Sequence, residues 1–164
     1  MRVAVIDSGP LINLVHLGLA RELTLYFNVV YVPRAVQREV NKKQRFRYRL
    51  QKLFNSGIFE RCASSHRWNV ELLRIDLDDG EAEALIQAQE KSAAVFIGDE
   101  TRARAICTNF GLQPVGAVRL LARLHREGRA GEPAVLSRKL RRDLRFRVTA
   151  KVIEAAIALA NEPI

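Results

Sequence analysis

The chain has 164 residues, 48% of them hydrophobic and 27% charged, which is typical of one ordinary globular domain and excludes a largely disordered chain. No stretch approaches the roughly 20 apolar residues that span a bilayer, and the first predicted strand begins almost at Met1. We therefore expect no membrane segment, no signal peptide and a cytoplasmic location. The net charge of +9 favours polyanionic partners, although a basic, inert solvated surface would have the same composition.

Cysteine and histidine give no sign of a disulfide framework or a zinc site. In a chain that is not secreted, Cys62 and Cys107 are expected to be reduced thiols. The three histidines, His16, His66 and His125, are scattered along the chain without the spacing of metal ligands. A zinc site is therefore not expected.

The first half of the chain is predicted to alternate strands and helices. In order, the sequence predicts strand 2–6, helix 10–18, helix 19–27, strand 29–33 and helix 34–55. The first strand is a short β-branched run that ends abruptly at Asp7. Pro33 stands where a proline opens a helix, and Gly57 is a plausible stop.

The second half continues the alternation after a less legible stretch. We expect short extended pieces at 58–63 and 72–75, helix 81–91, strand 93–97, helix 100–110, strand 113–115, helix 117–128 and two helices at 133–142 and 148–160. This order predicts a three-layer α/β/α fold with a central parallel sheet covered on both faces. Doubly wound sheets place ligands at the carboxyl ends of their strands.

Two aspartates follow predicted central strands. Asp7 comes directly after strand 2–6, and Asp99 lies two residues after strand 93–97. The carboxyl ends of parallel strands meet at one edge of a sheet, so we expect the two side chains to converge. For either aspartate alone, a helix N-cap is an equally good interpretation.

Glu39 lies on the predicted helix 34–55, at the margin of the core face defined by Val36 and Val40. The alternative for Glu39 is an ion pair with Lys42 or Lys43.

The outer face of the same helix carries a basic stripe at spacings of three and four, formed by Arg34, Arg38, Lys42, Arg45, Arg49 and Lys52. Lys43 and Arg47 interrupt the apolar face in the middle, which indicates that the helix projects from the body there.

The segment Asp79–Ala84 offers two further acids. Glu81 falls between Ala84 and Leu85 on a small apolar face that should meet the sheet, whereas Glu83 falls on the polar face. We therefore prefer Glu81 as a site residue and interpret Glu83 as an assisting or solvated side chain.

Carboxylates gathered at one strand edge repel one another, so an ionised cluster needs a cation or must take up protons. Oxygen ligands select hard ions, here Mg²⁺ or Mn²⁺. Such an ion can activate water and neutralise phosphoryl oxygens. The sequence thus combines a site of the metal-nuclease type with a basic surface.

This pattern resembles the PIN domain, as in VapC-type toxins of toxin–antitoxin modules. The segment VIDSGPLINL, which contains Asp7 and Ser8, resembles the family's opening strand and acidic turn. The segment VYVPRAVQREV, which contains Glu39, resembles the family's second strand and the helix that carries its glutamate.

The remaining motifs resemble a PIN subgroup with a GExEA motif. That motif stands in LDDGEAEALIQAQ, and the distance along the chain to Asp99 fits Glu81 better than Glu83. The fourth acid and following turn are resembled by FIGDETRARAICTNFGLQPVGAVRLLARLHREG. The resemblance covers a PIN-like domain at 1–128, and 129–164 is similar to the subgroup's helical extension, packed on the same domain. One departure is Gly116-Ala117, where the subgroup often has a threonine.

The resemblance implies a Mg²⁺- or Mn²⁺-dependent endoribonuclease, the toxin of a type II toxin–antitoxin system. It implies RNA as substrate, a homodimer and an antitoxin partner. Its catalytic residues would be Asp7, Glu39, Glu81 and Asp99, with Asp7, Glu81 and Asp99 holding the metal. Ser8, Arg102 and Arg104 would contact substrate. The cluster within 138–147 would bind RNA backbone or an acidic antitoxin.

Other doubly wound proteins fit less well. Phosphatases of the haloacid dehalogenase type need an aspartate where Gly9 stands, and receiver domains need adjacent acids after the first strand. No glycine-rich phosphate loop is present. The serious alternative is a catalytically weak PIN-like module that binds nucleic acid or protein without cutting.

Overall fold

The computed structural model describes residues 2–164. In this part of the chain the centre is a five-stranded parallel sheet with the order β3-β2-β1-β4-β5. The strands are β1 (Val3–Ile6), β2 (Val29–Pro33), β3 (Phe59–Cys62), β4 (Val95–Ile97) and β5 (Gln113–Val115). The predicted α/β class with a central parallel sheet is confirmed.

Helices connect the strands and continue beyond the last one. They are α1 (Ser8–Leu17), η1 (Ala20–Leu25), α2 (Arg34–Lys42), α3 (Gln44–Phe54), α4 (Arg67–Leu73), α5 (Asp79–Glu90), α6 (Thr101–Asn109), α7 (Ala117–Arg126), α8 (Pro133–Leu144), α9 (Ala150–Ala158) and η2 (Leu159–Asn161). No helix among the described residues is both long and apolar enough to cross a membrane.

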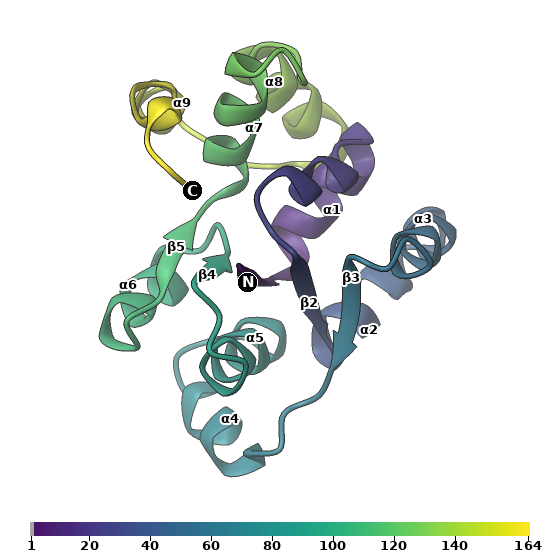
Figure 1. The fold of residues 1–164 in the computed structure, drawn as a ribbon, viewed down its shortest axis with the longest axis vertical. Coiled ribbons are helices and arrows are strands. Elements are labelled where there is room, and N and C mark those ends of the chain that lie inside the picture. The colour runs from purple at the N-terminus through teal and green to yellow at the C-terminus, as the bar shows by residue number, and fades with distance from the viewer. Residues whose placement is uncertain (1) are drawn as a thin grey trace.

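Alternate side chains of β1 enter two different cores, which makes the fold three layers deep. Ala4 and Ile6 pack with residues of α1, α2, α3, α7 and α8. Val3 and Val5 point the other way and pack with residues of α4, α5 and α6. Figure 1 shows α4, α5 and α6 on one side of the sheet and α7 and α8 on the other. All four β1 residues are buried because helices cover both faces.

The predicted helix 34–55 is in fact two helices, α2 and α3. Lys43 breaks it with an extended backbone (φ −95°, ψ 94°). The break occurs where the apolar face is interrupted, and it lets Val40 of α2 and Phe46 of α3 both reach the same core. The six residues of the basic stripe are all exposed, but the stripe crosses both helices.

The short extended piece predicted at 72–75 is also wrong. Leu72 and Leu73 end helix α4, and the amide of Arg74 donates to the carbonyl of Val70. A four-residue apolar run does not distinguish a strand from a helix end. The other predicted piece, 58–63, does contain strand β3.

The strand order reverses at β1, which lies between β2 and β4. In such sheets the crevice for a ligand opens at the carboxyl ends of the central strands. The carboxyl ends of β1 and β4 are joined there, because the amide of Asp7 donates to the carbonyl of Ile97 at 2.9 Å. The C-terminal residues also reach the main core, in which Leu140 and Ile164 are buried.

Candidate functional site

Asp7 is a buried carboxylate at the end of β1. Its side chain is only 6% exposed, and Oδ1 has no hydrogen-bond partner. The pKa of Asp7 is raised to about 8, mainly by burial, which the amide of Ser8 opposes and to which the nearby Asp78, Glu81 and Glu39 contribute. Asp7 occupies the N-cap position of α1 without a side-chain cap hydrogen bond. Helix capping therefore does not account for this carboxylate.

Three carboxylates face one point beside Gly80. A Cβ atom built on Gly80 would lie 3.3 Å from Asp7 Oδ1, 3.4 Å from Asp78 Oδ1 and 3.6 Å from Glu39 Oε2. Glycine leaves that point open, whereas any other residue would fill it. Glu39 thus lies beside Asp7.

Glu81 combines a structural contact with a free oxygen. Its Oε2 accepts the amide of Asp78 at 3.2 Å, while Asp78 Oδ1 accepts the amide of Glu81 at 2.8 Å. This reciprocal pair is a capping box at the start of α5. Glu81 Oε1 is buried and unpartnered. Burial raises the pKa of Glu81, helped by Asp78, Glu100 and Glu39.

Asp7, Glu39, Asp78 and Glu81 form one acidic group. The sequence did not identify Asp78 as one of its members. The signal was present, since an aspartate three residues before a glutamate at a helix start is the pattern of a capping box.

Of the two interpretations of Glu83, an assisting or a solvated side chain, the structure excludes the solvated one. It is 8% exposed, and its carboxylate accepts the backbone amides of Arg34 at 3.3 Å and Ala35 at 2.8 Å. These are the first amides of α2, which lack intrahelical partners. Pro33, at the N-cap position, makes no side-chain cap hydrogen bond, so Glu83 caps the helix from outside. Glu83 therefore positions the helix that carries Glu39.

Asp99 serves two purposes at the end of β4. Its Oδ1 accepts the amide of Ala117 at 2.7 Å, which caps helix α7, and its Oδ2 is unpartnered. Burial raises the pKa of Asp99 to about 6, although the Ala117 amide and Arg104 lower it. Asp99 therefore does cap a helix, but that helix is α7 and not α6, which directly follows Asp99. At Gly116-Ala117, a backbone amide meets the carboxylate.

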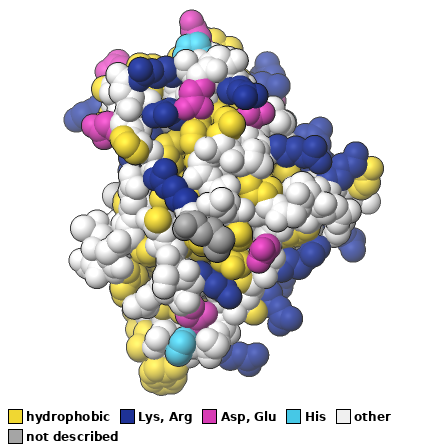
Figure 2. Space-filling model, in the orientation of Figure 1, with side chains coloured by type: hydrophobic (Ala, Val, Ile, Leu, Met, Phe, Trp, Pro, Cys, Tyr) yellow, Lys and Arg dark blue, Asp and Glu magenta, His cyan; other side chains and the backbone are white. Residues whose placement is uncertain are grey.

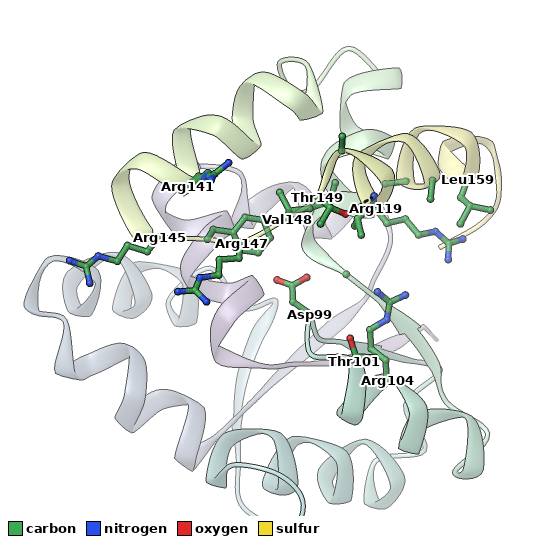
Figure 3. Close-up of a pocket in the computed structure, with 17 residues that line it drawn as sticks. Asp99, Thr101, Arg104, Arg119, Arg141, Arg145, Arg147, Val148, Thr149 and Leu159 are labelled. Carbon is green, nitrogen blue, oxygen red and sulfur yellow. Dashed lines mark hydrogen bonds between the residues drawn. The ribbon is translucent and has the colours of Figure 1, made fainter.

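The expected substrate contacts occupy three different settings. Ser8 is buried at the first position of α1. Arg104 lines a cleft together with Asp99, as Figure 3 shows, and Arg102 is exposed and does not line it. Side chains two positions apart on a helix differ in direction by about 200°, so Arg102 and Arg104 point in different directions.

The carboxylates fit a hard divalent cation by their chemistry. Asp7, Glu81 and Asp99 each keep one buried oxygen without a partner, and the point beside Gly80 is open. Within residues 2–164, no three His, Cys, Asp or Glu side chains are grouped closely enough to hold a metal ion. The fit therefore rests on the oxygen-only donor set and its unpartnered atoms, and the side chains would have to close around an ion.

The comparisons with known proteins agree with this architecture. No curated protein shows a significant match to the chain. A family model described as a PIN domain matches residues 3–162, nearly the whole sequence. PIN domains are generally nucleases, which typically use divalent metals. The chain belongs to the PIN-domain family.

Proposed function

We propose that the protein is a Mg²⁺- or Mn²⁺-dependent endoribonuclease that hydrolyses phosphodiester bonds in RNA. The main supporting observation is that Asp7, Glu81 and Asp99 each keep one buried carboxylate oxygen without a partner, and that Asp7 and Asp99 follow the neighbouring strands β1 and β4. Buried carboxylates without partners are costly unless they bind a proton or a cation. Such oxygens are suitable ligands for a hard cation once the side chains close around it.

Each side chain has a distinct role in this proposal. Asp7, Glu81 and Asp99 would hold the cation, which when bound would neutralise charge on phosphoryl oxygens and lower the pKa of water. Glu39 is half-buried beside the point that it shares with Asp7, so it is placed to accept a proton from the attacking water. Glu83 holds α2, and with it Glu39, in position.

The surface supports a polyanionic substrate. The net charge is +9, and Figure 2 shows Lys and Arg side chains gathered over the region of α3 and near α8. Phosphate contacts from such residues supply affinity without sequence selection. We further infer that the nuclease works in the cytoplasm, as the toxin of a type II toxin–antitoxin system, as a homodimer and with an antitoxin protein as partner.

The test is cleavage of labelled RNA by purified protein. Cleavage with Mn²⁺ should stop when a chelator is added and should fall at least about 100-fold in Asp7→Asn, which removes one ligand charge. Glu22→Gln is the matched control, because Glu22 lies outside the acidic group. Equal activity of Asp7→Asn and the unaltered protein would overturn the proposal. Metal-independent RNA binding without cleavage would identify the non-cutting module instead.

The toxin role has its own test. Induced expression of the protein should arrest bacterial growth, and expression of Asp7→Asn should not. Growth arrest by both proteins would overturn toxicity through this site.

A further inference from the structure

A cleft lies between Asp99 and the C-terminal segment, residues 141–159. Its volume is about 1030 Å³. Its basic lining residues are Arg104, Arg119, Arg141, Arg145 and Arg147, and Asp99 is the only acid among the lining residues. Figure 3 shows Arg147 on one side of Asp99 and Arg104 on the other. The cleft thus places Asp99 beside several positive charges.

Most of these arginines have no partner within the protein. Across residues 2–164, Arg104, Arg141, Arg145 and Arg147 form neither an ion pair nor a side-chain hydrogen bond. Arg119 is tied to the C-terminal tail, where it donates to the carbonyl of Pro163 at 3.0 Å. Outside the cleft, Arg142 pairs with Asp143 at 2.7 Å and Arg123 pairs with Glu127 at 2.5 Å. The guanidinium groups of Arg141, Arg145 and Arg147 are therefore free to bind an anion.

The backbone at Arg145 is unusual for an arginine. This residue ends α8 in the left-handed region (φ 59°, ψ 26°), where glycine is the ordinary choice. The turn directs the following residues along the cleft, so that Arg147 and Val148 also line it. A side chain kept at a strained position beside a site suggests a use for that side chain.

Apolar side chains also line the cleft, interspersed with the arginines. Phe146 and Val148 line it together with Val152 and Leu159, the last two being 47% and 38% exposed. A double helix would present mainly phosphates to such a cleft. A single strand presents both phosphates, which the arginines can bind, and unpaired bases, which can pack on the apolar side chains.

We infer that the cleft binds the phosphates of single-stranded RNA on one side of the bond to be cut, with Arg145 and Arg147 as the principal contacts. This inference rests on the proposed function, because only that function makes Asp99 the end of the cleft toward which the RNA would run. The cationic lining residues are all arginine, without lysine, and the planar guanidinium pairs with phosphate through two parallel hydrogen bonds. The C-terminal segment would then be part of the substrate-binding surface as well as part of the fold.

The experiment measures binding without cleavage. The full chain carrying Asp7→Asn, in a chelator, is titrated against a fluorescent ten-nucleotide RNA at several salt concentrations. Arg145→Gly with Arg147→Ala should weaken binding at least about tenfold and reduce the salt slope by about 1.4, at about 0.7 for each lost phosphate. Glycine suits the left-handed turn, so the backbone is kept.

The control is Arg21→Ala with Arg126→Ala, which removes the same charge from exposed positions outside the cleft. It should bind within about threefold of the parent protein. Equal losses in the two double variants would overturn the inference, because they would indicate a general charge effect. The inference would also be overturned if Arg145 and Arg147 were needed to bind poly-glutamate but not to bind RNA. That result would assign the cleft to an acidic protein. Failure of cleavage in the unaltered protein would contradict the proposed function but would leave this binding result standing.

Discussion

Asp7 and Asp99 occupy equivalent places in the topology but different electrostatic surroundings. Both follow central strands of one sheet, and both have a raised pKa because they are buried. Around Asp7 the charged neighbours are all carboxylates, and its pKa is about 8. Beside Asp99 stand the guanidinium of Arg104 and the amide of Ala117, and its pKa is about 6. Strand position therefore fixes where a carboxylate lies, whereas its neighbours decide how readily it carries charge.

The largest expected effect concerns the two glutamates of α5. Glu81→Gln removes a buried oxygen that would bind the cation, so RNA cleavage should fall at least about 100-fold. Glu83→Gln keeps an oxygen that can accept the amides of Arg34 and Ala35, so cleavage should stay within about fivefold, with a stability loss of about 1 kcal/mol. The measurement is kcat on a labelled RNA together with urea unfolding. A larger loss of activity in Glu83→Gln than in Glu81→Gln would reverse the assignment.

The next effect is the pH dependence of stability in the absence of metal. Asp7 has a pKa of about 8 in the folded protein against an ordinary value of 3.8, so the folded state binds more protons between those values. The free energy of unfolding should therefore fall as pH rises from about 4 to about 8, and Asp99 should add to the fall only up to about pH 6. Asp7→Asn should be more stable than the unaltered protein at pH 8, by about 2 kcal/mol or more.

Urea unfolding in a chelator, from pH 5 to 9, checks this window. Asp99→Asn serves as the comparison, because it should flatten only the part of the curve below about pH 6. Parallel curves for Asp7→Asn and the unaltered protein between pH 6 and 8 would show that Asp7 is not held protonated.

The smallest expected effect tests the open point beside Gly80. In Gly80→Ala the new methyl group would lie 3.3 Å from Asp7 Oδ1, so the carboxylates must shift, and Mn²⁺ affinity should fall about tenfold. Gly9→Ala is the matched control, since Gly9 is also the second residue of a helix but its methyl would meet nothing within 4 Å. Both changes should leave stability equal or raise it by up to about 1 kcal/mol. Titration calorimetry that finds equal Mn²⁺ affinity in both variants would contradict a shared site at Gly80.

The features that follow local rules could be predicted from the sequence. The apolar run that ends at Asp7 indicated a buried strand with an acid at its end, and the alternation of elements predicted the parallel sheet. The helical periodicity placed Glu81 on the inner face of its helix, where it is buried.

The features that depend on contacts between elements could not be predicted in the same way. Glu83 lies on the polar side of its own helix, and it is buried only because α2 brings two unpaired amides to it. The arginine cleft joins residues of α6, α7 and the C-terminal segment, so no local pattern reveals that they share a wall.

The most direct test of the central claim is the position of Mn²⁺ in a crystal of the protein. Anomalous scattering should show a strong peak among the carboxylates of Asp7, Glu81 and Asp99, and the peak should disappear in Asp7→Asn. A peak at another place, or one that persists in Asp7→Asn, would contradict the account.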